Sequence, residues 1–316
     1  MLDLIIIGGA AAGSSAAIYC ARRKLNFKMV TIDKGGEVAL SGEVNNWPGI
    51  LSIQGFELAQ KFAEHVKSYG VEVDEGWKAE KIEKIKKHYK ITAKNAVGEE
   101  KAYETKTIII ATGIHPRHLE ITGEKEFYQK GVTYCTVCDG PLFKNKTTAT
   151  IGSGNSALES VLMMADIAKK VYLLSKYPNM PEQKGGFPKG EEILIDKVKA
   201  LPNVEIIYSA ETTKILGSNR VTGLEYKNEK NKKQEIAVEG VMVHIGQIPN
   251  SQFADGNVEK NKIGEIMVDE KCRASLPGIF AAGDVTDVAY KQIGIAAGQG
   301  IVAALAAIEY INRWKE

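Results

Sequence analysis

The sequence predicts an α/β protein with two Rossmann-like dinucleotide-binding domains, the second inserted in the first, on the basis of three observations. An apolar, β-branched run at residues 2–7 passes through a glycine-rich turn at 8–13 into a helical stretch at 14–24. The same order of strand, glycine-rich turn and helix returns at residues 148–169. A chain of 316 residues is also long enough for two domains, each with its own core.

The first glycine-rich turn points to a bound nucleotide. Its backbone amides and the following helix N-terminus can face a pyrophosphate. Asp33 follows about 20 residues after Gly13, at the end of a β-branched run over 28–32, where an acid bonds the ribose hydroxyls of an adenosine. Ala10 stands at the second fingerprint glycine, where the backbone approaches the phosphates most closely. The alternative is a plain tight turn, but strand, turn, helix, strand and acid in register favour a nucleotide.

The second turn, residues 152–157, reads G-x-G-x-x-A between a strand at 148–151 and a helix at 158–169. Two dinucleotide sites in one chain imply two cofactors. Residues 34–38 and 45–49 are rich in turn residues and are expected to be loops that wrap a cofactor. Further patterns predict strands at 78–92, 102–110, 171–174, within 204–238, at 241–245 and at 278–283, and helices at 56–69, 191–200 and 293–310.

Cys135 and Cys138 form a Cys-x-x-Cys pair that Asp139 follows directly. A two-residue spacer lets both sulfurs lie within disulfide range, and a helix that begins there would favour the thiolate. The alternatives are half of a zinc site, which needs two more ligands, and an inert structural disulfide. Because nucleotide motifs flank the pair, we favour a dithiol that cycles with its disulfide.

The composition is that of an ordinary soluble protein, with 44% hydrophobic and 25% charged residues and a net charge of +2. Such a balance provides no large field for nucleic acid or an anionic membrane. We expect no membrane span, since no stretch approaches about 20 apolar residues. The apolar start is preceded by Asp3 and interrupted by glycines, unlike a signal peptide. With a redox-active pair as its main cysteine motif, the chain is expected in a reducing cytoplasm.

Together these motifs resemble the low-molecular-weight thioredoxin reductases, which are FAD-dependent pyridine nucleotide-disulphide oxidoreductases. The resemblance covers nearly the whole chain, and the Cys-x-x-Cys-Asp between two nucleotide turns is its most specific part. The residues that carry it are 8–13, Gly35-Gly36-Glu37 (where the family usually has Gly-Gly-Gln), 46–49, 111–113, 134–140, 152–157, 280–284 and Lys291-Gln292.

The resemblance implies FAD in an outer domain built from residues 1–113 and 244–316, and a nicotinamide nucleotide with the cysteine pair in residues 114–243. It implies that Cys138 faces the flavin, that Cys135 attacks the partner's disulfide, and that Asp139 moves the proton. The plainer role for Asp139 is an N-cap of the following turn. The implied FAD residues are Gly8, Gly9, Ala10, Ala11, Gly13, Asp33, Lys34, Gly35, Gly36, Glu37, Val38, Asn46, Ala111, Asp284, Lys291, Gln292 and Ile293. The implied nicotinamide-nucleotide residues are Gly152, Gly154, Asn155, Ser156, Glu159, Ser175 and Lys176.

The chain departs from the family after residue 174. NADPH-dependent members carry His-Arg-Arg and a further Arg there, whereas this chain has Ser-Lys-Tyr at 175–177 and then Pro181. We therefore expect NADH to serve at least as well as NADPH, with both weak, unless Lys184 or Lys189 folds back as a substitute.

The expected activity is transfer of electrons from NADH or NADPH through FAD and the cysteine pair to thioredoxin or a glutaredoxin-like protein, in a homodimer by analogy. The alternatives are a donor other than NAD(P)H, as in a ferredoxin-linked reductase or an oxidase, and a nucleotide-binding redox sensor. His115 and His118 are spaced like a metal pair, but we expect no metal site.

Overall fold

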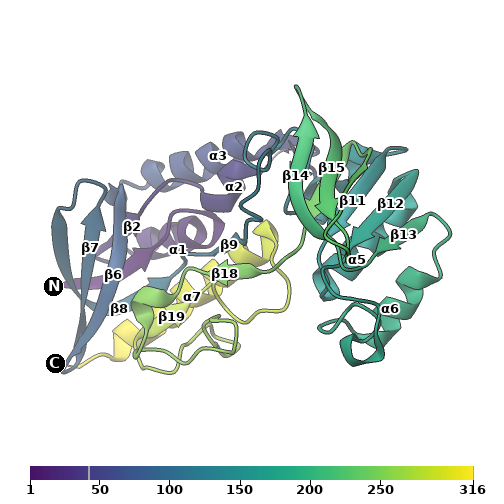
Figure 1. Cartoon of the computed structure of the whole chain (residues 1–316). Helices are drawn as coiled ribbons and strands as arrows, with labels where there is room; N and C mark the ends of the chain where they lie inside the picture. Colours follow the sequence, from purple (N-terminus) through teal and green to yellow (C-terminus); the bar gives the residue numbers. More distant parts are fainter. Residues whose placement is uncertain (42, 316) are drawn as a thin grey trace. The chain divides into compact units, whose positions relative to one another are not determined.

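The computed structural model describes residues 1–41 and 43–315. It divides the chain into two compact units, Met1–His115 with Ile248–Glu316, and Pro116–Gln247 (Figure 1). The chain thus passes between the units twice, after His115 and after Gln247. Short strands β9 (Ile114–Pro116) and β18 (Gln247–Pro249) pair with each other at these crossings. The assignment of FAD to residues 1–113 and 244–316, and of the nicotinamide nucleotide to residues 114–243, stays a prediction.

The first unit is built on a parallel sheet whose two central strands end in apolar residues that are buried on both faces, residues 4–7 and 108–110. Its order is β5-β2-β1-β8, with β19 also paired to β8, and β8 continues into the antiparallel strands β7 and β6. The strands of this unit are β1 (Leu2–Ile7), β2 (Phe27–Thr31), β3 (Glu43–Val44), β4 (Ile53–Gln54), β5 (Val73–Glu75), β6 (Trp77–Ile85), β7 (His88–Asn95), β8 (Glu100–Ile110) and β19 (Ile279–Ala281).

The helices of the first unit are α1 (Ala11–Arg22), α2 (Gly36–Leu40), α3 (Gly55–Ser68), the 3-10 turn η3 (Gln252–Ala254) and α7 (Ile293–Arg313). Helix α7 packs closely on α1, because Gly300 has no side chain: a Cβ there would lie 2.1 Å from the carbonyl oxygen of Ala12. By length and composition α7 could cross a membrane, contrary to the expectation that no stretch comes near that length. Its alanines lie in the core that α1 lines, which explains the apolar composition.

The second unit holds a parallel sheet in the order β10-β17-β11-β12-β13 and a separate antiparallel sheet β14-β15-β16. Two units with parallel, nucleotide-fold sheets confirm the predicted fold class. The strands are β10 (Val132–Thr133), β11 (Thr147–Ile151), β12 (Lys170–Leu174), β13 (Val204–Ile207), β14 (Glu211–Gly217), β15 (Val221–Lys227), β16 (Lys233–Ile236) and β17 (Gly240–Val243). The helices are α4 (Thr136–Asp139), η1 (Gly140–Phe143), α5 (Asn155–Ile167), η2 (Pro181–Gln183) and α6 (Glu192–Lys199).

Two local predictions were wrong. The strand expected at 78–92 is two strands, β6 and β7, because the backbone reverses at Lys86, which has φ +52°. The loop expected at 34–38 contains the start of helix α2 at Gly36. The first miss lies where a short turn interrupts an alternation that does not show the break. In the second, glycines that are typical of turns stand at the start of a short helix.

Candidate active site

Cys135 and Cys138 form a disulfide, with their Cα atoms 5.3 Å apart and both side chains half-buried. Cys135 is the N-cap of helix α4, and its Sγ accepts a hydrogen bond of 3.2 Å from the backbone N–H of Cys138. The same N–H would stabilise a thiolate on Cys135 after reduction. With the two sulfurs bonded to each other, the half-zinc-site alternative finds no support. In residues 1–41 and 43–315, no three His, Cys, Asp or Glu side chains gather as metal ligands.

Asp139 lies beside the disulfide and occupies the N-cap position of turn η1, which begins at Gly140. Its side chain makes no cap bond to that turn, so it does not act as a side-chain cap. Instead the carboxylate accepts a short hydrogen bond from the hydroxyl of Thr133, on β10. Burial raises the pKa of Asp139, and the bond from Thr133 lowers it in part. Thr133 was not predicted as a site residue, because no sequence motif connects a strand residue to an acid six positions later.

The first glycine-rich turn joins β1 to α1 in a cradle that requires glycine at two positions. A Cβ on Gly13 would lie 2.0 Å from the carbonyl oxygen of Gly8, and a Cβ on Gly8 would lie 2.2 Å from that of Ala111. Ala10 is the N-cap of α1 in extended backbone, and no side chain caps the helix. The N–H groups of its first turn thus face outward without an intrahelical partner. This cradle fits the pyrophosphate of FAD.

The acid after β2 is held in place by a backbone hydrogen bond. Asp33 is exposed, and its Oδ1 accepts a hydrogen bond of 2.7 Å from the N–H of Gly36, which leaves Oδ2 available for ligand hydroxyls. Around it, Lys34 is paired with Glu75, while the Val38 side chain is buried in the core. Val38 can therefore face FAD only through its backbone, whereas the Lys34 side chain is exposed. Glu37 is exposed on the first turn of α2, which begins at Gly36 beside Asp33.

The structure also brings distant parts of the predicted FAD set together. Asn46 Nδ2 donates to Gln292 Oε1 at 3.1 Å, although the two residues are 246 positions apart. Ala111 follows the carboxyl end of β8, where its N–H bonds the carbonyl of Ile7 at 2.7 Å. Asp284 follows β19, and burial raises its pKa to about 6 although Lys291 opposes the shift. Ile293 begins α7.

The second turn joins β11 to α5. Gly152 has φ +153°, and a Cβ there would lie 2.3 Å from the carbonyl oxygen of His244. Gly154 is the N-cap of α5, again without a side-chain cap. Asn155, the first helical residue, donates to Glu191 Oε1 at 2.7 Å and accepts from the backbone N–H of Glu191 at 2.9 Å. Ser156 and Glu159 are exposed on the first turns of the helix. This turn is compatible with a nicotinamide dinucleotide.

Comparison with known proteins decides the family. The family model described as pyridine nucleotide-disulphide oxidoreductase matches residues 2–300. The chain belongs to this family. The family implies FAD and a pyridine nucleotide, and it makes the protein an oxidoreductase. The structure of thioredoxin reductase from Streptococcus pyogenes MGAS5005 is 32% identical, with a TM-score of 0.88 over 99% of both chains, which confirms the resemblance predicted above.

Curated relatives in the family are longer. An NADH dehydrogenase of Bacillus subtilis is 38% identical over 98% of this chain and 59% of its own length. One alkyl hydroperoxide reductase subunit, from Escherichia coli, is 38% identical over 99% of this chain and 59% of its own length. The chain thus spans about 59% of the relatives it matches, so their partners do not carry over directly.

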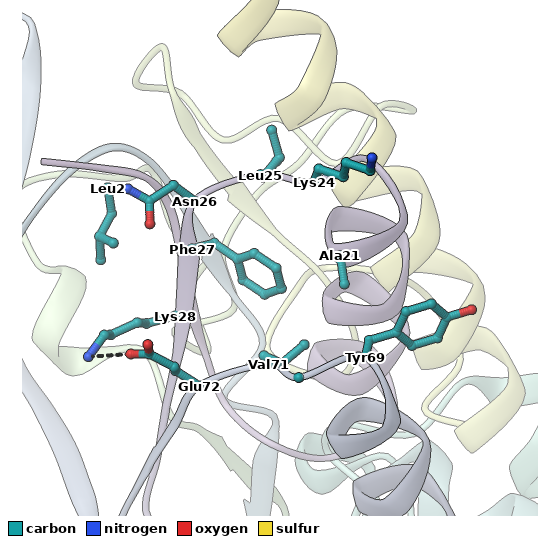
Figure 2. A pocket seen from close by; sticks show the side chains of 11 residues that line it. Leu2, Ala21, Lys24, Leu25, Asn26, Phe27, Lys28, Tyr69, Val71 and Glu72 are labelled. Carbon is teal, nitrogen blue, oxygen red and sulfur yellow. Dashed lines mark ion pairs between the residues drawn. The ribbon is translucent and has the colours of Figure 1, made fainter.

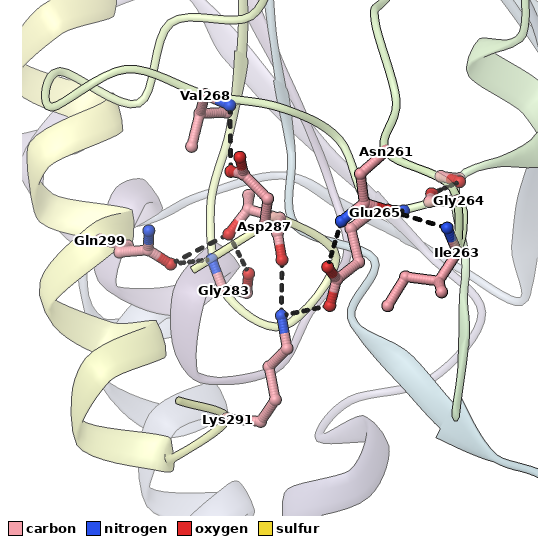
Figure 3. Close-up of polar contacts among 11 residues, drawn as sticks. Asn261, Ile263, Gly264, Glu265, Val268, Gly283, Asp287, Lys291 and Gln299 are labelled. Carbon is pink, nitrogen blue, oxygen red and sulfur yellow. Dashed lines mark hydrogen bonds and ion pairs between the residues drawn. The ribbon is translucent and has the colours of Figure 1, made fainter. Parts of the chain in front are cut away.

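Two residues assigned to cofactors by the resemblance are engaged elsewhere. The Ser175 hydroxyl is fully buried, donates to the carbonyl of Gly186 at 2.5 Å and accepts from the N–H of Tyr177. Its side chain organises the loop after β12 and is not available to a nucleotide. The Lys291 ammonium contacts the carboxylate of Glu265 at 2.8 Å and the carbonyl of Thr286 at 2.5 Å, so it braces the loop after Asp284 (Figure 3).

The cations near the second turn come from the loop between β12 and α6. Lys189 forms a backbone bridge with Gly154, so the loop folds back onto the turn. The Lys184 ammonium instead donates to the carbonyl of Gly190 at 3.3 Å and holds the loop. Lys176 is exposed, with its ammonium 5.3 Å from the ring centroid of Tyr177. Lys189, and not Lys184, therefore lies at the second glycine-rich turn, where it could take the place of the family's arginines.

A cavity of about 280 Å³ lies at the amino ends of β1 and β2, where Phe27, Tyr69 and the ion pair of Lys28 with Glu72 line it (Figure 2). Nucleotides bind beyond the carboxyl ends of parallel strands, and the glycine turns lie at those ends. This cavity is therefore not the cofactor site.

The two histidines spaced like metal ligands have separate partners: His115 bonds Asn250 at 2.8 Å and His118 bonds the Tyr134 hydroxyl at 2.7 Å.

Proposed function

We propose that this protein is a flavoprotein disulfide reductase that passes electrons from NADH or NADPH, through FAD and the Cys135–Cys138 pair, to thioredoxin or a glutaredoxin-like protein. The observation that carries the proposal is the disulfide at the start of α4 beside half-buried Asp139, in the unit that also holds the second nucleotide turn. The likeness to thioredoxin reductases supports a partner of that type. A homodimer in the cytoplasm completes the proposal by analogy.

When bound, FAD supplies two-electron transfer between the nicotinamide and the disulfide. The chain's own residues then perform thiol–disulfide exchange. The Cys135 thiolate, stabilised by the N–H of Cys138, attacks one sulfur of the partner's disulfide and expels the other as a thiolate. Cys138 next attacks Cys135 Sγ, which re-forms the internal disulfide and releases the partner as a dithiol. Asp139 delivers a proton to a leaving thiolate.

Anaerobic titration of the purified protein tests the proposal. We expect a yellow protein whose flavin absorbance bleaches on addition of NADH or NADPH and returns on addition of a small protein disulfide. A yellow protein that ignores both nucleotides would indicate a different electron donor. A colourless protein would favour the nucleotide-binding sensor.

Replacing Asp139 with Asn is expected to lower kcat for the protein disulfide by about 10² to 10⁴-fold, the usual contribution of a positioned acid or base. Because the acid acts in its protonated form, the rate should fall as pH rises through its pKa. Burial raises that pKa, so the fall should begin above the ordinary aspartate range. The check is kcat against pH for the wild type and Asp139→Asn.

The matched control is Thr133→Val. The Thr133 hydroxyl lowers the pKa of Asp139, so its removal should move the same fall to higher pH while the activity at low pH persists. A pH profile unchanged in both variants would contradict the role of Asp139.

For nucleotide choice, we expect kcat/KM with NADH to be at least that with NADPH, and both to be weak. A lysine gives one hydrated charge, where arginine forks would give two or three charge-assisted bonds of about 1.5–3 kcal/mol each. Replacing Lys189 with Ala should reduce kcat/KM for NADPH more than for NADH, because Lys189 lies at the turn. Lys184→Ala, which loosens the loop, should affect both nucleotides alike. A preference for NADPH of about a hundredfold in the wild type would refute the prediction.

A further inference from the structure

A chain of buried hydroxyl groups includes Thr136, the residue that follows Cys135, and ends at an imidazole. Thr136 Oγ1 lies 2.7 Å from His244 Nε2 and 2.6 Å from Ser160 Oγ, which lies 3.4 Å from Thr150 Oγ1. The three hydroxyl-bearing residues are buried. No sequence motif joins these positions, because Thr136 and His244 are 108 residues apart.

The chain connects four elements of one unit. Thr136 is the first residue of α4 and stands between the two cysteines, Ser160 is on α5, and Thr150 is on β11. His244 follows β17, where its N–H bonds the carbonyl of Ile151 at 2.8 Å. The four-residue helix that carries the disulfide is therefore attached to the carboxyl end of the parallel sheet.

Each hydrogen bond among these hydroxyls and the imidazole can be assigned a donor and an acceptor. Burial lowers the pKa of His244 to about 4, so the imidazole is neutral near pH 7. A neutral ring nitrogen can accept a hydrogen bond from the Thr136 hydroxyl. The Thr136 oxygen then accepts a hydrogen bond from Ser160, and the Ser160 oxygen accepts one from Thr150. The reverse order, with Nε2 protonated, also satisfies Thr136 and Ser160. Either way the Thr136 hydroxyl has a donor and an acceptor, and displacing it would leave buried polar groups unsatisfied.

We propose that Thr136 and His244 are positioning residues that hold Cys135 and Cys138 at bonding distance when their disulfide is reduced. The inference rests on the proposed redox role of the pair. Reduction removes the covalent link from a helix of only four residues, whereas the hydrogen bonds of Thr136 do not depend on that link. When the two thiols are kept close together, the effective concentration of one at the other is high, and this favours re-formation of the disulfide. Loss of the anchor should therefore shift the equilibrium toward the dithiol.

The test equilibrates the full-length protein, with its cofactors, in buffers of reduced and oxidised dithiothreitol. Reduced dithiothreitol gives two electrons and two protons to the pair and becomes its own cyclic disulfide, and alkylation with mass analysis counts the protein thiols. Thr136→Val removes both hydrogen bonds of the hydroxyl and should shift the equilibrium toward the dithiol about fivefold or more, the order expected when neutral hydrogen bonds are lost. Thr136→Ser, which keeps the hydroxyl, should stay within about twofold of the wild type.

Thr148→Val is the matched control. Thr148 is fully buried on the same strand as Thr150, and its hydroxyl has no hydrogen-bond partner among the described residues. Its replacement should leave the equilibrium unchanged. His244→Phe removes one of the two hydrogen bonds of Thr136, so it should shift the equilibrium in the same direction. The double variant should shift it no further than Thr136→Val, which already removes that bond.

Equal behaviour of Thr136→Val and Thr148→Val would overturn the inference, as would a full additional shift in the double variant. The measurement is independent of the nicotinamide donor. A flavin that ignores NADH and NADPH would therefore refute the proposed donor while the dithiothreitol equilibrium still decides the role of Thr136 and His244.

Discussion

Cys135→Ser is expected to abolish turnover with a protein disulfide, lowering kcat by at least about 10³-fold, while NADH or NADPH still reduces the flavin. The variant lacks the thiolate that attacks the partner, whereas the nucleotide turns are untouched. Cys138→Ser should also lose turnover, because no thiol remains to resolve the mixed disulfide. By the resemblance, which places Cys138 at the flavin, this second variant should alter the flavin spectrum as well. Stopped-flow absorbance and steady-state assays separate the two half-reactions.

The remaining cysteines supply the controls. Cys20 and Cys272 are buried, and burial raises the pKa of Cys20 to about 12 and that of Cys272 to about 11, which keeps both as unreactive thiols. Cys20→Ser and Cys272→Ser should therefore retain turnover if they fold. Undiminished disulfide reduction by Cys135→Ser would remove the basis of the mechanism.

Gly13→Ala is expected to lower the FAD content of the purified protein by about tenfold or more, because the turn must open to admit the methyl group. The added Cβ would lie 2.0 Å from the carbonyl oxygen of Gly8, in the backbone of the cradle itself. The ratio of flavin to protein absorbance after purification measures the loss, and circular dichroism checks that the chain is folded.

Two alanine substitutions in α7 make this result specific. Gly298→Ala enters open space and should keep its FAD. Gly300→Ala would place a Cβ 2.1 Å from the carbonyl oxygen of Ala12, so it strains the packing of α1 against α7 rather than the turn. Should Gly300→Ala lose FAD as fully as Gly13→Ala, the loss would reflect a displaced helix and not the cradle.

The features that the sequence predicted well are those whose causes are local. An apolar β-branched run, a turn that excludes side chains and a helix lie within about 30 residues of one another in each nucleotide fold. Their pattern is therefore visible without any distant contact, as in β1, residues 8–13 and α1. The same holds for the disulfide, since a two-residue spacer already brings two cysteines within range.

The fold class, the two glycine turns and the cysteine pair could thus be predicted from the sequence, because each depends on steric limits among near neighbours. Which polar groups are free depends instead on the three-dimensional arrangement of the chain. It buried Ser175 against Gly186, engaged Lys291 with Glu265 and brought Lys189 to the second turn. It also joined Thr136 to His244 across 108 residues. Such pairings follow from how strands order in a sheet and how loops fold back on it, and no local pattern of residues encodes which hydroxyl, ammonium or imidazole will meet.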